Sequence, residues 1–263
     1  MYPGESHIRG GGRRWIFPEK WLWLPEGSRG IGRATSIMLA QSGARVAVNF
    51  THNGPALCHV VSSIREAGGE ALEMQADVRN PDDVRQLVEA VVDRWGRLDI
   101  LVNNAGMSIA MKPIADMTWD EFAQKLNDEM KAAFVLTQAA TGVMKTQKYG
   151  RLLYVASGLA KHPAPKMAAH GSAKAALVQF ARYVAQEYGP YGITANVISP
   201  GLVRTEATAF QPREHLAHVA SMTPLGHVAE PGDVARAIVM LLGDHASFLT
   251  GVCVPVNGGM AMD

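Results

Sequence analysis

The chain has 263 residues, 48% hydrophobic and 19% charged, which is enough to bury the core of one large domain. Its net charge of +1 at pH 7 gives no electrostatic reason to expect nucleic acid or a membrane surface as a partner. Cys58 and Cys253 lie far apart and outside any metal-ligand spacing, and no apolar run reaches the ~20 residues of a membrane span, so we expect a cytoplasmic protein without disulfides or a metal site.

The chain begins with a basic segment that lacks the apolar core and the cleavage site of a signal peptide. We expect residues 1–14 to form a disordered leader and residues 15–263 to form one folded domain. The first strand is expected at about 20–26, where the sequence KWLWLPE is atypical because it carries Trp21 and Trp23.

A glycine-rich turn, GSRGIGRA at 27–34, follows this strand and leads into a helical pattern. Gly30 and Gly32 let the backbone come close to a pyrophosphate, and the N–H groups at the start of the helix point outward to receive it. Glycine-rich turns are common, so this one gains weight only from the motifs that follow.

Farther along, short apolar runs alternate with longer helical patterns. Strands are predicted at 44–50, 98–106, 150–157 and 193–201, and helices at 81–96, 118–145 and 168–189. Pro81, Asp82 and Asp83 are typical of a helix start, whereas Gly96 and Gly189 are typical of helix ends. Apolar strands that are each followed by a helix predict a single doubly wound α/β domain, with a parallel sheet covered on both faces.

The motifs after the glycine turn are ADV at 76–78, NNAG at 103–106, Ser157, Lys174, ISPGLVRT at 198–205 and VNGG at 256–259. Together with the turn, they resemble the short-chain dehydrogenase/reductase family from Gly27 to Gly259. Within that family, TPLGHVAEPGDVA at 223–235 is most similar to the 3-oxoacyl-carrier-protein reductases. The resemblance implies a Rossmann fold with a seven-stranded parallel sheet, a nicotinamide cofactor and a homo-oligomer, either a tetramer or a dimer.

The charged side chains near the adenosine ribose indicate which nicotinamide cofactor is bound. An acidic residue at the end of the second strand pairs with the ribose of NAD(H), whereas a nearby arginine accommodates the 2′-phosphate of NADP(H). This chain ends that strand with Asn49 and has Arg29 in the turn, which favours NADP(H); the alternative is that Arg29 is an ordinary surface charge. The resemblance places the cofactor against Gly27, Ser28, Arg29, Gly30, Ile31, Gly32, Asn49, Asp77, Val78, Asn104, Ala105, Gly106, Lys174, Pro200, Gly201, Val203 and Thr205.

The catalytic positions depart from the family pattern. The family's proton donor is a tyrosine thirteen residues after a serine and four before a lysine, and between Ser157 and Lys174 that place is held by His170. A family asparagine is replaced by Glu129. The resemblance implies reduction of a ketone, of the 3-oxoacyl or polyketide-like kind and either free or carrier-bound, to an alcohol. A neutral imidazole can still donate one hydrogen bond, so a weakened or altered reductase is expected.

Several alternatives remain open. His170 is also compatible with a cleft that has no catalytic activity. The whole chain is compatible with a non-catalytic relative that binds cofactor or acts as a scaffold or oligomer partner. Tyr154 lies three residues before Ser157, so we expect it on the opposite face of the sheet rather than as a substitute donor. The segment 206–222, with the apolar Phe210 and Met222, is the expected substrate lid.

We hypothesise that a shift of the reading frame explains the atypical sequence of the first strand. With permitted codons for Lys20–Glu26, a frame shifted by one base reads Val-Ala-Leu-Val-Thr-Gly, which resembles the family's first strand. Residues 1 to about 26 are then translated out of frame; the alternative is a genuinely divergent strand. As written, two tryptophans overpack a central strand, and Glu26 places a negative charge beside the pyrophosphate. Resequencing this stretch of the gene decides between the two.

Overall fold

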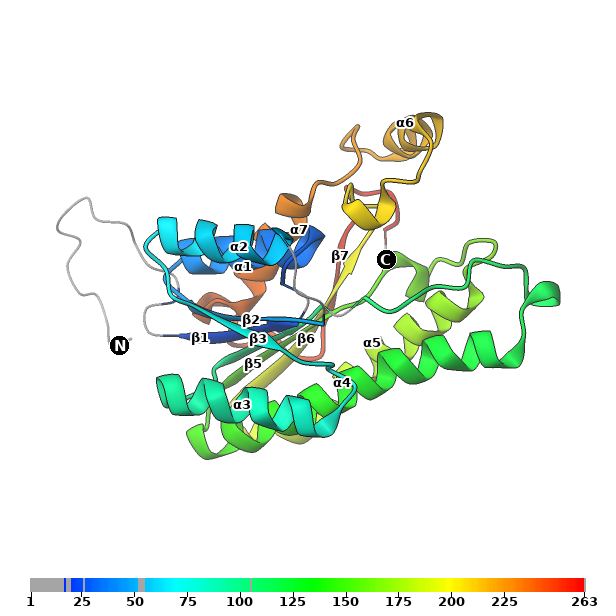
Figure 1. The fold of residues 1–263 in the computed structure, drawn as a ribbon. Helices are drawn as coiled ribbons and strands as arrows, with labels where there is room; N and C mark the ends of the chain where they lie inside the picture. The colour runs from blue at the N-terminus through cyan, green and yellow to red at the C-terminus, as the bar shows by residue number, and fades with distance from the viewer. Residues whose placement is uncertain (1–16, 18–19, 26, 52–54, 105, 263) are drawn as a thin grey trace, which may run out of the picture.

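The computed structural model describes residues 17, 20–25, 27–51, 55–104 and 106–262 (Figure 1). The predictions for the leader at 1–14, for Glu26 and Ala105, and for the side chains of Trp21 and Trp23 lie outside the described residues. The rest of the chain forms a three-layer α/β structure.

The middle layer is a seven-stranded sheet in the order β3-β2-β1-β4-β5-β6-β7, and every neighbouring pair of strands is parallel. Its strands are β1 (Trp21–Pro25), β2 (Arg45–Phe50), β3 (Ala71–Gln75), β4 (Ile100–Asn103), β5 (Gly150–Val155), β6 (Ile193–Pro200) and β7 (Cys253–Val256). This confirms the predicted doubly wound parallel sheet. The predicted strand at 98–106 is shorter, because only four of its residues pair with neighbouring strands.

Helices cover both faces of the sheet (Figure 1). They are α1 (Gly30–Gln41), α2 (Pro55–Glu66), α3 (Pro81–Trp95), α4 (Trp119–Gln147), α5 (Ala168–Tyr188), α6 (Arg213–Met222) and α7 (Pro231–Leu242). One hydrophobic core lies between the sheet and α3, α4 and α5, and a second lies between the sheet and α1, α2 and α7. None of the described helices has the length and apolar character that crossing a membrane requires.

The helix ends follow mostly from local sequence. Asn80 caps α3 by accepting a hydrogen bond from the N–H of Asp82, Pro81 opens the helix, and Gly96 closes it with φ +83°. The predicted helix end at Gly189 is confirmed, because Gly189 is the C-cap of α5, with a φ of −50°. The left-handed residue is Gly192, which follows a short 3-10 turn.

Two short connections bring functional motifs to one edge of the sheet. The glycine turn follows β1, and NNAG begins at the end of β4, so both lie at the carboxyl ends of adjacent central strands. Strand order reverses at this point, with β2 on one side of β1 and β4 on the other. In open parallel sheets, ligands bind in the crevice at such a switch point.

Candidate active site

The glycine turn forms the start of α1 and leaves no room for larger residues. Gly30 has φ +48°, and a Cβ built on it would lie 3.2 Å from Cγ2 of Thr205. Thr205 comes from the segment after β6, so this contact joins two motifs that are far apart in the sequence. The structure thus brings together two of the motifs that were predicted to bind the cofactor.

The start of α1 holds a carboxylate. The N–H of Gly30 donates a hydrogen bond to Oε2 of Glu206 over 3.1 Å, and Nη1 of Arg33 lies 3.5 Å from Oε1 of the same side chain. A helix N-terminus attracts anions because its free N–H groups and its dipole both favour negative charge. The Glu206 carboxylate is a stand-in for a phosphate here, so the turn fits the pyrophosphate of a dinucleotide.

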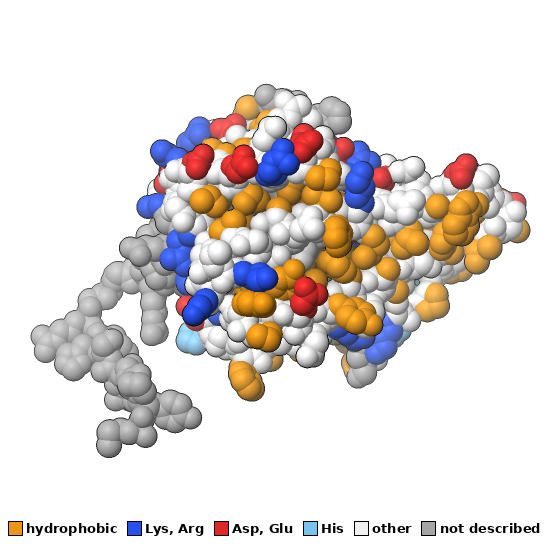
Figure 2. All heavy atoms as spheres, turned by 90° about the horizontal axis from the view of Figure 1, so that it is seen from below, with side chains coloured by type: hydrophobic (Ala, Val, Ile, Leu, Met, Phe, Trp, Pro, Cys, Tyr) orange, Lys and Arg blue, Asp and Glu red, His pale blue; other side chains and the backbone are white. Residues whose placement is uncertain are grey.

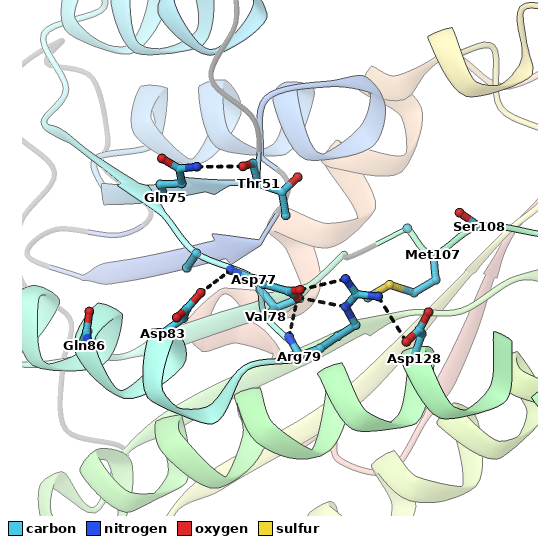
Figure 3. Close-up of a pocket in the computed structure, with 12 residues that line it drawn as sticks. Thr51, Gln75, Asp77, Val78, Arg79, Asp83, Gln86, Met107, Ser108 and Asp128 are labelled. Atoms are coloured by element: carbon cyan, nitrogen blue, oxygen red, sulfur yellow. Dashed lines mark hydrogen bonds and ion pairs between the residues drawn. The ribbon is translucent and has the colours of Figure 1, made fainter. Parts of the chain in front are cut away.

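A cleft of about 640 Å³ lies at the ends of β2, β3 and β4 (Figure 3). Among the residues that line it are Asp77, Val78 and Gly106, which were predicted to contact the cofactor, and Thr51. A volume of this size is typical of small-molecule sites. The cleft therefore fits the adenosine part of a dinucleotide.

The Asp77 carboxylate is already engaged within the cleft. Nε and Nη2 of Arg79 donate to its two oxygens over 3.0 and 2.8 Å, and Nη1 of Arg79 lies 3.2 Å from Asp128 (Figure 3). The hydrogen bond from Arg79 holds the pKa of Asp77 below its ordinary value. Asp77 is accordingly an ionised acceptor whose lone pairs a ligand would share with Arg79.

Asn49 corrects the prediction for the end of the second strand. Strand β2 ends at Phe50, like the predicted strand at 44–50, and Asn49 is 1% exposed, so it does not face a ligand. Its Nδ2 donates to the carbonyl of Ala76 over 3.0 Å. Asn49 therefore fixes the turn after β3, and Thr51 is the residue from this strand end that reaches the cleft.

The other predicted cofactor residues lie along the same edge of the sheet. Pro200 ends β6, and Val203 is buried in an isolated bridge with Ala229. In the glycine turn, Gly27, Gly30 and Gly32 are buried, whereas Arg29 is exposed. The remaining residues of this group, which are partly or largely exposed, are Ser28, Ile31, Asn104, Gly106 and Gly201.

A buried cluster of charges contains Glu129 and Lys174, two of the residues that were predicted to be catalytic. Nζ of Lys174, from α5, donates to Oε1 of Glu129 over 2.6 Å and to the carbonyl of Val155 over 2.7 Å. The second Glu129 oxygen accepts a 2.7 Å hydrogen bond from Nζ of Lys125, one turn earlier on α4. Burial acts to raise the pKa of Glu129, but the two ammonium groups outweigh it and hold the pKa below its ordinary value.

Lys125 was not predicted from the sequence. Its signal is the spacing of four residues to Glu129, which places the two side chains on the same helix face. That spacing is common on solvent-exposed faces, so only the burial of both side chains, 2% and 3% exposed, distinguishes this pair.

Ser157 and His170 are two further residues that were predicted to be catalytic. Ser157 follows β5, and its Oγ accepts a hydrogen bond from the N–H of Leu159 over 3.3 Å. His170 lies in the first turn of α5, one turn before Lys174, and its buried Nδ1 has no hydrogen-bond partner among the described residues. Tyr154 is fully buried against Phe180 and shares a 2.7 Å hydrogen bond with Thr137, which confirms that it is a core residue.

His170 is neutral at pH 7. Its partial burial and the nearby ammonium groups of Lys174 and Lys125 lower its pKa to about 4, and the Glu129 carboxylate opposes them only in part. Because a neutral imidazole has one N–H donor and one acceptor, His170 can donate a single hydrogen bond to a carbonyl oxygen. Among the described residues, no group of His, Cys, Asp and Glu side chains could hold a metal ion.

The low pKa of His170 predicts a loss of stability in mild acid. The unfolded chain takes up this proton near pH 6.5, but the folded chain resists it down to about pH 4, so stability falls as the pH drops through that window. In urea unfolding at pH 7 and pH 4.5, His170→Asn should lose about 2 to 3 kcal/mol less than the parent chain. His215→Asn, at an exposed position on α6, is the control and should behave like the parent. An equal loss in His170→Asn and parent would contradict the assignment.

Comparison with known proteins identifies the family of this chain. Residues 27–261 match the family model described as Enoyl-(Acyl carrier protein) reductase. A 3-oxoacyl-(acyl-carrier-protein) reductase from Synechocystis sp. is 34% identical over 236 residues, covering 89% of this chain and 94% of the relative. The corresponding reductase of Staphylococcus aureus is 31% identical over 238 residues, covering 89% of this chain and 95% of the relative.

Among solved structures, a short-chain type dehydrogenase/reductase from Mycobacterium ulcerans superposes with a TM-score of 0.88 and 28% sequence identity. The superposition covers 93% of this chain and 90% of that one. The chain therefore belongs to the short-chain dehydrogenase/reductase family of oxidoreductases, whose cofactor is a nicotinamide dinucleotide.

Proposed function

We propose that this chain is an NADP(H)-dependent oxidoreductase that reduces a ketone, of the 3-oxoacyl or polyketide-like kind, to an alcohol. The observation that carries the proposal is the hydrogen bond from Lys174 to the carbonyl of Val155, two residues before Ser157 and on the sheet edge that also carries the glycine turn. The Lys174 ammonium also acts on His170. The two relatives named as 3-oxoacyl reductases support the ketone as substrate, either free or bound to a carrier.

The chain's own residues have separate roles in this reaction. The bound nicotinamide supplies the hydride. Ser157 steadies the carbonyl oxygen with its hydroxyl, and His170 donates a hydrogen bond to that oxygen as it gains negative charge. Lys174 holds the nicotinamide ribose, and burial together with the Lys174 ammonium keeps His170 neutral. Because the imidazole is shorter than a phenol, this arrangement supports a weaker reductase than a tyrosine would.

NADP(H) is preferred over NAD(H) because of the charges at the adenosine end. Arg29 is exposed within the glycine turn, where a guanidinium can pair with a 2′-phosphate. No acidic side chain stands at the end of β2, since the strand ends at Phe50 and Thr51 follows.

Glu206 should weaken cofactor binding, because its carboxylate occupies the place that a phosphate oxygen needs on Gly30. We expect Glu206→Gln to bind NADPH roughly fivefold more tightly than the parent, about 1 kcal/mol for one charge at a helix N-terminus. Titration of NADPH fluorescence measures this. Glu214→Gln removes the same charge from an exposed position on α6 and should leave the affinity unchanged. Weaker binding by Glu206→Gln would show that the carboxylate does not compete with the cofactor.

A non-catalytic role is the second candidate. It is favoured by the replaced residues at 170 and 129 and by the ion pair that Lys174 forms with Glu129.

The structure also offers a surface on which an oligomer could form. Figure 2 shows hydrophobic side chains gathered on the face formed by α3, α4 and α5. Phe134 of α4 and Tyr183 of α5 are 52% and 68% exposed. A tetramer or dimer built on this face would bury them.

The substrate would enter beneath the segment after β6. Residues 206–222 form a 3-10 turn and helix α6, which stands away from the sheet (Figure 1). Phe210 and Met222 are 66% and 47% exposed, and Leu216 is half-buried. Closure of this segment over an apolar substrate would bury them, which makes it a substrate lid.

Consumption of NADPH and of NADH with a panel of ketones, including 3-oxoacyl thioesters, tests the proposed function. We expect oxidation of NADPH by at least one 3-oxoacyl compound and slower oxidation of NADH. Lys174→Met is the matched inactive control. Activity in the parent chain would exclude the non-catalytic role, and no activity in either the parent or His170→Tyr would exclude the reductase.

A further inference from the structure

Lys125 is a buried lysine outside the positions that the family pattern marks as catalytic. Its side chain is 2% exposed, and its Nζ donates to Oε2 of Glu129 over 2.7 Å and to the carbonyl of Met107 over 3.1 Å. A lysine is rarely buried unless its charge is paired, because taking an ammonium group out of water is costly. Glu129 supplies that charge, but it does so for two lysines.

The three side chains form one cluster, Lys125–Glu129–Lys174, which we call the ion cluster. It contains two ammonium groups and one carboxylate, with hydrogen bonds of 2.7 and 2.6 Å on the two carboxylate oxygens. The ion cluster thus carries a net positive charge in a part of the molecule from which water is largely excluded. In such surroundings a charge acts over longer distances than it does in water.

The ion cluster also joins four elements of the site. Met107 follows the NNAG motif and lines the cofactor cleft, and Lys125 holds its carbonyl from α4. At the other end, Lys174 of α5 holds the carbonyl of Val155, which is two residues before Ser157. Lys125 therefore links the cofactor loop to Lys174 through Glu129.

We propose that Lys125 is a positioning residue of this active site: it fixes the Glu129 carboxylate, and through it the Lys174 ammonium, and it gives the ion cluster its net positive charge beside His170. This inference rests on the proposed reductase function. Without Lys125, the Glu129–Lys174 pair would be neutral overall, and one Glu129 oxygen would be buried without its ammonium partner.

The protonation of His170 depends directly on the net positive charge of the ion cluster. The charged groups that act on it come from two helices, Lys125 and Glu129 from α4 and Lys174 from α5. A positive neighbour disfavours the protonated imidazole, so removing Lys125 raises the pKa of His170. A residue that served only packing would leave this protonation unchanged when its bulk was retained.

The test uses the full-length chain and variants at two positions of α4. Lys125→Met keeps the length of the side chain and removes its charge, and Lys125→Arg keeps the charge. Lys131→Met is the matched control, since Lys131 is exposed on the same helix. Lys125→Gln is also neutral but can still donate hydrogen bonds to both oxygens, so it makes the same test if Lys125→Met does not fold.

The first measurement is the protonation of His170 at pH 5, read from its imidazole signals by NMR without substrate or cofactor. We expect His170 to be mostly neutral in the parent, Lys125→Arg and Lys131→Met. In Lys125→Met and Lys125→Gln, its pKa should rise by about one unit, which leaves roughly half of the molecules protonated. Equal protonation in the parent and in both neutral variants would overturn the proposal.

The second measurement is ketone reduction at pH 7. Lys125→Met should lower kcat about tenfold while leaving KM for NADPH nearly unchanged, and Lys125→Arg should restore most of the loss. An arginine variant as impaired as the methionine variant would also overturn the proposal. A parent chain without activity would instead overturn the reductase function, and the NMR result would then decide alone whether Lys125 sets the charge of the ion cluster.

Discussion

His170→Tyr is expected to reduce ketones about a hundredfold faster than the parent chain. A phenol extends farther from the helix than an imidazole, so its O–H reaches the place where the carbonyl oxygen has to lie. A misplacement of about 1 Å at this point is enough to cost that factor. The neighbouring Lys174 ammonium also favours loss of the phenol proton, which brings a poor acid closer to the working pH. Steady-state kcat/KM for a 3-oxoacyl substrate with NADPH measures the gain.

His170→Phe is the matched control for this change, because it adds the same ring without the hydroxyl. We expect it to be less active than the parent, since it removes the only donor at this position. If His170→Tyr were no better than His170→Phe, the hydroxyl would not be the missing group. The fault would then lie with the other replaced position, and a variant that combines His170→Tyr with Glu129→Asn would be the next to measure.

Glu129→Gln is expected to lower the free energy of unfolding by about 3 to 5 kcal/mol. The change leaves Lys125 and Lys174, which are 2% and 9% exposed at their side chains, buried without a carboxylate between them. Breaking a buried ion pair on one side costs far more than the net contribution of the pair, because the remaining charge stays out of water. Urea unfolding at pH 7 measures the loss.

Glu89→Gln is the control for this prediction. Glu89 is on the surface of α3, with its side chain 64% exposed and 3.9 Å from Arg85, so its removal should cost less than about 0.5 kcal/mol. Adding Lys125→Met to Glu129→Gln should recover part of the lost stability, because it removes one of the two unpaired ammonium groups. A Glu129→Gln variant as stable as the parent would mean that the lysines shed their protons or reach water.

Most of the fold could be predicted from the sequence, because local signals and the global fold agree. Apolar strands such as 150–157 and 193–201, each close to a helical pattern, are sufficient to predict a buried parallel sheet, and the caps at Asn80 and Gly96 are local to their helix. Gly189 also ends its helix as predicted, although it does so without positive φ, and the left-handed residue is Gly192 after the next short turn.

Within the site, the sequence by itself determined which positions are proposed as catalytic, because Ser157, His170 and Lys174 match the spacing of the family pattern. Only the tertiary structure decided what surrounds them. Lys125 joined the site because α4 packs on α5, Asn49 turned inward because β2 pairs with β3, and Glu206 reached Gly30 across the sheet edge. The physical reason is that burial and charge pairing depend on contacts between distant segments, whereas periodicity and turn chemistry are properties of neighbouring residues.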